Sequence, residues 1–167
     1  MDSNSYDNKY LEIVSDILEN DEFKKLRNID HHGITRYEHS IKVSYNAYKL
    51  AKSLKLDDIA VARAGLLHDF FYSNSHKMDK ERVTSLFTHP KKAVANSGKY
   101  FYLNQMEEDI IATHMFPVNL SVPKYAESWV VNLTDKTVSL NEFRKKFGYK
   151  LAYVFNLYLL FLINYMK

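Results

Sequence analysis

Apolar residues at helical spacing, with very few helix breakers between them, constrain the fold of this chain more than any other feature. The 167 residues include only four glycines and three prolines. Apolar side chains recur every three or four residues near the N-terminus, in Tyr6, Tyr10, Val14 and Ile17. This period is typical of amphipathic helices, and it continues along most of the chain. We therefore expect an all-α fold, a single compact helical bundle.

Local signals indicate where some of these helices begin. Thr35 and Glu38 have the spacing of a capping box, so Thr35 is the expected N-cap of a helix. The polar segment 71–88, FYSNSHKMDKERVTSLFT, has the composition of a loop with a short helical turn. Pro90 follows it and suits the first turn of the next helix.

No linker, repeat or low-complexity segment divides the chain, so we expect one domain over residues 1–167. A core of about 30–142 should carry an N-terminal helix over 5–20 and a C-terminal helix over 141–166, both packed on it. The latter contains LAYVFNLYLLFLINYM, which is nearly all apolar yet shorter than the roughly 20 residues of a membrane span. We interpret it as a core or oligomer-interface helix, and a membrane-associated helix remains the less favoured alternative.

Composition excludes several classes of function. The chain has no cysteine, so disulfides, thiolate catalysis and cysteine zinc sites are excluded. That composition suits a reducing compartment, and the polar N-terminus is unlike a signal peptide, so we expect a cytoplasmic protein. The net charge of +3 is mild and no basic stripe alternates with aromatics, so duplex nucleic acid is not an expected partner. Aromatic-rich helices at both ends are compatible with a homodimer.

Histidine and aspartate side chains recur at positions that helical spacing turns toward the core. The six candidates are His39, His68, Asp69, His89, His114 and Asp135. One inward histidine is more often a core residue than a ligand. Six such groups buried without partners would each cost several kcal/mol, roughly 2–7 for a polar group. A divalent cation needs this mixture of ligands, and helix bundles supply it from facing helices. The sequence therefore predicts a metal site.

The order of these residues resembles the HD-domain superfamily of metal-dependent phosphohydrolases. The resemblance spans about residues 30–142, through EHSIKV, ARAGLLHDFFY, THPKKAVANS, EEDIIATHM and ESWVVNLTDK. It implies that His39, His68, Asp69 and Asp135 hold a first divalent metal ion. Two further histidines resemble the two-metal branch of the superfamily, which implies that Asp69 bridges two ions and that His89 and His114 complete the second site. Iron, manganese, zinc, cobalt or nickel would serve, as one or two ions.

The chain has no cysteine nucleophile and no serine in a recognisable triad, so the expected nucleophile is a metal-bound hydroxide. The expected reaction is hydrolysis of a phosphate ester or anhydride in a nucleotide or other small phosphorylated metabolite. Asp69, Lys136 and Arg36 are the candidate catalytic residues, the two cations as phosphate contacts. Candidate substrate contacts are His31, His32, Lys91 and Tyr72.

Departures from the family pattern leave alternatives open. Tyr72 stands where many relatives carry lysine or glutamate, and the Gly-Tyr-Pro signature of the cyclic di-GMP phosphodiesterases is absent. The aromatic run Phe70, Phe71 and Tyr72 could stack on a nucleobase, although core packing is favoured. The same ligand set would also serve a di-iron oxygenase, or a non-catalytic, metal-stabilised module that senses a nucleotide.

Overall fold

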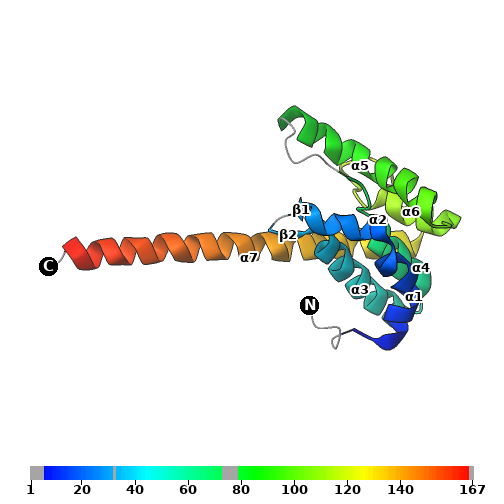
Figure 1. Cartoon of the computed structure of the whole chain (residues 1–167), viewed down its shortest axis with the longest axis horizontal. Helices are drawn as coiled ribbons and strands as arrows, with labels where there is room; N and C mark the ends of the chain where they lie inside the picture. Colours follow the sequence, from blue (N-terminus) through cyan, green and yellow to red (C-terminus); the bar gives the residue numbers. More distant parts are fainter. Residues whose placement is uncertain (1–5, 32, 73–78, 166–167) are drawn as a thin grey trace.

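The protein is all-α, apart from two strands of two residues each (Figure 1). The computed structural model describes residues 6–31, 33–72 and 79–165. In chain order the elements are α1 (Asn8–Glu19), α2 (Asp21–Lys24), the 3-10 helix η2 (Lys25–Asn28), β1 (Asp30–His31), β2 (Ile34–Thr35), α3 (Arg36–Leu54), α4 (Asp58–Leu67), α5 (Asp79–Tyr100), α6 (Gln105–Thr113) and α7 (Ala126–Tyr165). The expected fold class is confirmed.

The start of α3 is fixed by the capping box that the sequence predicts. The Thr35 hydroxyl accepts a hydrogen bond from the backbone N–H of Glu38 at 3.2 Å. The Glu38 carboxylate in turn accepts one from the backbone N–H of Thr35 at 2.9 Å. Two N–H groups that the first helical turn would leave unpaired are thus satisfied. This start places Arg36 and His39 in the first turn of α3.

The centre of the bundle is the close contact between α3 and α4, with α1 packed on α4. A Cβ atom added at Gly65 would lie 3.2 Å from the Cα of Ser44, so only glycine allows the two backbones this approach without a shift. The Tyr10 hydroxyl of α1 donates to Ser44 Oγ at 2.9 Å, and Ser44 Oγ donates to the carbonyl of Ala62 at 2.6 Å. This chain of hydrogen bonds joins three helices at a point where all side chains are buried.

Helix α5 differs from the sequence-based expectation. It begins at Asp79, so most of the segment expected to be loop is helical, and Pro90 lies inside the helix. A polar run is compatible with a helix, because only part of a helix surface needs apolar side chains. Proline removes one backbone hydrogen bond but does not have to end the helix. Of that segment, residues 73–78 lie outside the described part of the chain.

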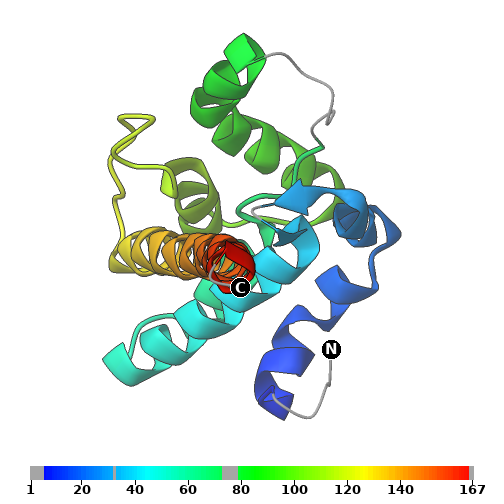
Figure 2. The same cartoon turned by 90° about the vertical axis from the view of Figure 1, so that its left-hand side faces the viewer.

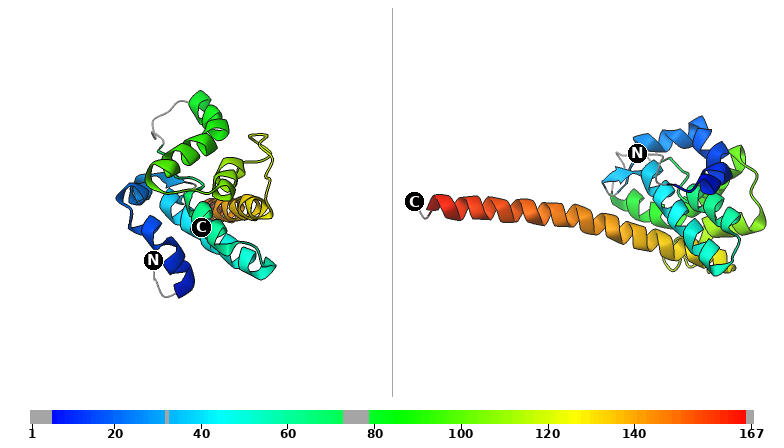
Figure 3. Two further views of the ribbon diagram at one scale, coloured as in Figure 1. Left: turned by 90° about the vertical axis from the view of Figure 1, so that its right-hand side faces the viewer. Right: turned by 90° about the horizontal axis from the view of Figure 1, so that it is seen from below.

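Helix α7 also corrects an expectation. A separate C-terminal helix was expected over residues 141–166, whereas Ala126–Tyr165 is one helix of 40 residues. Its first part lies against α3 and α6, and its C-terminal part extends beyond the bundle (Figures 1 and 3). Figure 2, which looks along α7, shows α3 beside it. The described helices include none with both the length and the apolar character needed to cross a membrane.

Candidate metal centre

Five helices bring the six predicted ligands together. His39 lies in the first turn of α3, His68 and Asp69 directly follow α4, His89 lies in α5, His114 directly follows α6, and Asp135 lies in α7. All six are buried, with less than one tenth of each residue exposed. Helix ends and helix interiors from distant parts of the chain therefore supply one interior cluster.

One end of the cluster is formed by His39, His68 and Asp135. His39 Nε2 lies 3.0 Å from Asp135 Oδ1, and His68 Nε2 lies 3.8 Å from the same oxygen. The ligand atoms of all three residues lie within 4.8 Å of one another. Two imidazole nitrogens and a carboxylate oxygen at this spacing could hold a divalent cation.

The other end is formed by His89, His114 and Asp69. The Nε2 atoms of the two histidines are 3.0 Å apart. Asp69 Oδ1 lies 3.5 Å from His89 Nε2 and 3.6 Å from His114 Nε2. Its other oxygen, Oδ2, lies 3.9 Å from His68 Nε2. Asp69 thus directs one oxygen toward each end, the geometry of a carboxylate that could bridge two ions.

Hydrogen bonds on the outer side of the rings fix which nitrogen faces the cluster. His68 Nδ1 lies 2.8 Å from the carbonyl oxygen of Gly65, and His114 Nδ1 lies 2.8 Å from that of Ile111. A carbonyl oxygen can only accept, so each Nδ1 must carry the proton. In the neutral ring the Nε2 lone pair is then directed at the cluster, as a metal ligand requires.

Two polar atoms at the centre lack partners among the described residues. His68 Nε2 and Asp69 Oδ1 are buried and make no hydrogen bond there. A buried polar group without a hydrogen bond is costly, about 1–3 kcal/mol in proteins. A buried nitrogen lone pair and a buried carboxylate oxygen that both lack hydrogen bonds fit a bound cation.

The charge state of the cluster also suits a cation. Burial lowers the pKa of His68 to about 4, so its ring is neutral near pH 7. Burial would raise the pKa of Asp69, but the facing His68 and His114 rings hold it well below its usual value. Burial opposes ionisation of Asp135 too, yet its hydrogen bond from His39 lowers its pKa. Both carboxylates are therefore ionised.

Two histidines differ from His68. Burial would lower the pKa of His114, but its contact with Asp69 raises it. His39 contacts two carboxylates. Burial would lower its pKa, but hydrogen bonds from the ring to Asp135 and Glu142 raise it to about 9. Glu142 was not among the predicted site residues. It lies seven residues, two helical turns, after Asp135 and so on the same face of α7, and this spacing is the signal that could have identified it.

Arg36 lies against the cluster and is held in place by Phe71. Arg36 Nη1 donates to the Phe71 carbonyl at 2.6 Å, and its guanidinium lies 3.9 Å from the centre of the Phe71 ring. Its Nε is 3.9 Å from Asp69 Oδ2. The His89 ring also stacks on the Phe71 ring, with 5.1 Å between the ring centroids. Phe70 and Phe71 are both buried, in agreement with the favoured core role of the aromatic run.

The remaining candidates lie farther from the ligand atoms or outside the described residues. Lys136 Nζ donates to the backbone carbonyl of His114 at 3.2 Å, at the edge of the cluster. The Tyr72 hydroxyl donates to Glu22, at 2.9 Å from its carboxylate, so α2 holds this side chain. Lys91 is exposed on α5. The side chain of His31 and the whole of His32 lie outside the described residues, and all these substrate roles remain predictions.

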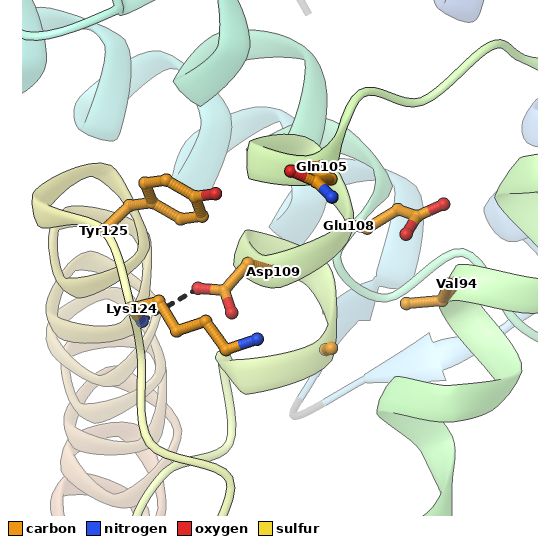
Figure 4. Close-up of a pocket in the computed structure, with 7 residues that line it drawn as sticks. Val94, Gln105, Glu108, Asp109, Lys124 and Tyr125 are labelled. Carbon is orange, nitrogen blue, oxygen red and sulfur yellow. Dashed lines mark hydrogen bonds between the residues drawn. The ribbon is translucent and has the colours of Figure 1, made fainter.

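A cavity of about 380 Å³ lies between α5, α6 and the residues that precede α7 (Figure 4). It is lined by Val94, Gln105, Glu108, Asp109, Ala112, Lys124 and Tyr125, none of which is a predicted site residue. Asp109 accepts hydrogen bonds from the Lys124 N–H at 3.0 Å and from Ser128 Oγ at 2.7 Å. Asp109 therefore ties α6 to the start of α7, the two helices that position His114 and Asp135.

Comparison with known proteins gives one match. The family model described as HD domain matches residues 36–140. The matched segment begins at Arg36 and ends five residues after Asp135, so it contains all six predicted ligands. No curated protein and no solved structure matches the chain.

Proposed function

Because the chain belongs to the HD domain family, we propose that it is a metal-dependent phosphohydrolase acting on a small phosphorylated metabolite such as a nucleotide. The observation that supports this proposal is the buried cluster, in which two groups of three side chains each have ligand atoms within 4.8 Å of one another. One group is His39, His68 and Asp135, and the other is His68, Asp69 and His114. His89 is not in either group, but its Nε2 lies 3.0 Å from His114 Nε2.

In this proposal the protein side chains hold and orient rather than attack. His39, His68 and Asp135 would hold one divalent cation, His89 and His114 would hold a second, and Asp69 would contribute to both sites. Divalent cations bound in this way lower the pKa of water and stabilise charge on phosphoryl oxygens. The carboxylates are ionised at neutral pH, so they bind cations without first losing a proton.

Two cationic side chains flank the ligands and would contribute to phosphate binding. Arg36 is only 6 % exposed and faces Asp69, so its charge acts in a poorly solvated setting. Lys136 contacts the His114 carbonyl and follows Asp135 directly. We assign to both the role of attracting and orienting the anionic substrate next to the cluster.

Metal content measured by inductively coupled plasma mass spectrometry, on protein purified without chelator, tests the proposal first. We expect about two ions per chain in the wild type, as in other two-metal hydrolytic sites. Asp69→Ala, which removes the bridge, should lose most of both, and His114→Ala should lose about half. Lys91→Ala, an exposed change on α5, should leave the content unchanged.

Turnover is tested next, by release of inorganic phosphate from a panel of nucleotides and sugar phosphates under anaerobic conditions with Mn²⁺. Release that is lost in Asp69→Ala supports the proposal. A wild-type protein without metal, even after reconstitution, would refute it. Two bound irons together with oxygen consumption would instead identify an oxygenase.

A further inference from the structure

Glu142 of α7 contacts the outer side of His39. Its Oε2 lies 3.0 Å from His39 Nδ1, and its Oε1 lies 3.1 Å from Lys42 Nζ. Glu142 is only 7 % exposed, so a carboxylate is buried directly behind a predicted ligand. It lies two residues beyond the segment that matches the HD domain family.

We propose that Glu142 is a positioning residue, which orients His39 and strengthens it as a metal ligand. This inference rests on the proposed metal centre. His39 Nε2 faces Asp135, inside the cluster, while Nδ1 faces Glu142. A carboxylate that accepts a hydrogen bond from the outer nitrogen fixes the ring rotation and its tautomer, and it raises the basicity of the inner nitrogen.

Comparison with two other histidines of the cluster shows what Glu142 adds. His68 and His114 have backbone carbonyl oxygens on their outer nitrogens. A carbonyl fixes ring and tautomer as well, but it carries no full negative charge. A charged acceptor makes the stronger hydrogen bond. Of these three histidines, His39 is the one whose outer nitrogen faces a carboxylate.

Lys42 of α3 pairs with the other oxygen of Glu142. Its ammonium group lies on α3, three residues after His39, and its side chain is 36 % exposed. It pairs with the Glu142 oxygen that does not face the ring. The ion pair with Lys42 and the contact with His39 thus use different oxygens of Glu142, so a substitution at Lys42 leaves the contact with the ring in place.

A purely structural role for Glu142, as half of an ion pair joining α3 to α7, makes a different prediction. In that case Lys42→Met and Glu142→Ala would weaken the same contact, and neither would change metal affinity by itself. If Glu142 positions His39, the two substitutions should differ in their effect on metal binding.

The experiment measures Zn²⁺ affinity of the full chain by competition with a chromophoric chelator, beside the thermal unfolding of the metal-free variants. We expect Glu142→Ala to bind Zn²⁺ roughly 10–100-fold more weakly. Glu142→Gln keeps an acceptor oxygen and loses the charge, so its loss should be smaller but at least about threefold. Lys42→Met and Asn141→Ala, an exposed neighbour on α7, should stay within about threefold of the wild type.

Each outcome decides between the readings. Unchanged Zn²⁺ affinity in both Glu142 variants, or an equal loss in Lys42→Met, would overturn the positioning role while leaving the proposed function intact. A wild-type chain that binds no Zn²⁺ would overturn both. Should Glu142→Ala fail to fold, as judged by circular dichroism, the comparison of Glu142→Gln with Lys42→Met gives the answer.

Discussion

Asn132 of α7 holds the end of α6 that carries His114, and its removal should have a measurable cost. Its side-chain amide lies 2.7 Å from the carbonyl of His114, 2.9 Å from that of Phe116 and 3.3 Å from that of Thr113. The amide has two hydrogens, so the two shorter contacts count as full hydrogen bonds. The residue is 2 % exposed.

The loss of stability expected for Asn132→Ala depends on which hydrogen bonds each of the three carbonyls retains. Two hydrogen bonds at about 1 kcal/mol each are lost. The Thr113 carbonyl still accepts from the Phe116 N–H, and the His114 carbonyl still accepts from Lys136. Only the Phe116 carbonyl is left without its partner, which adds about 1 kcal/mol. We expect the free energy of unfolding to fall by about 3 kcal/mol, or the melting temperature by roughly 6–12 °C.

Urea denaturation followed by circular dichroism measures this loss, on metal-free protein so that ligand binding does not contribute. Asn119→Ala is the matched control, since its amide donates one hydrogen bond of 3.0 Å to the Ala112 carbonyl near the same helix end. The control should cost about 1 kcal/mol. An Asn132→Ala loss no larger than that of the control would refute the reasoning.

Three further predictions concern the metal centre and the contact between α3 and α4. In metal-free protein the pKa of His39 is raised to about 9, so the stability it contributes is complete below pH 6.5 and lost as pH rises toward 9. The pKa of His68 is lowered to about 4, so its contribution is lost as pH falls from 6.5 toward 4. Each of these two contributions is worth about 3 kcal/mol. The free energy of unfolding should therefore be greatest near pH 6.5. A free energy of unfolding that does not change over pH 5–9 would contradict this. Lys136→Met should leave metal content unchanged and weaken inorganic phosphate binding at least about threefold, as seen by ³¹P NMR; unchanged binding would remove Lys136 from the substrate site. Gly65→Ala should lower the melting temperature despite the higher helix propensity of alanine, because its Cβ would press on the Ser44 backbone; a rise would show that α3 and α4 can move apart.

The sequence was sufficient for the fold class and for the convergence of the six predicted ligands. The helical period and a capping box such as Thr35 with Glu38 involve residues close together in the sequence, so a single sequence is enough to identify them. The ligand cluster was predictable because buried imidazole and carboxylate groups need partners, and the one partner that suits all of them is a cation.

What the sequence could not predict depends on contacts between distant segments. The spacing from Asp135 places Glu142 on the same helix face, but its contact with His39, 103 positions away in the chain, depends on how α7 packs against α3. The length of α5 was missed because Pro90 and a polar run resemble a helix start, although a helix tolerates both. The division of α7 into two helices was wrong because a change in composition does not by itself end a helix, and α7 contains no proline that would.

Helix α7 is continuous from the bundle to its far end. Asp135 and Glu142 lie in its first half, and residues 143–165 continue beyond them for roughly 35 Å at the rise of an α-helix. A helix transmits force along its length because each turn is hydrogen-bonded to the next. A force applied to residues 143–165 would therefore act on the contacts between α7 and α3, where Asp135 and Glu142 lie on either side of His39.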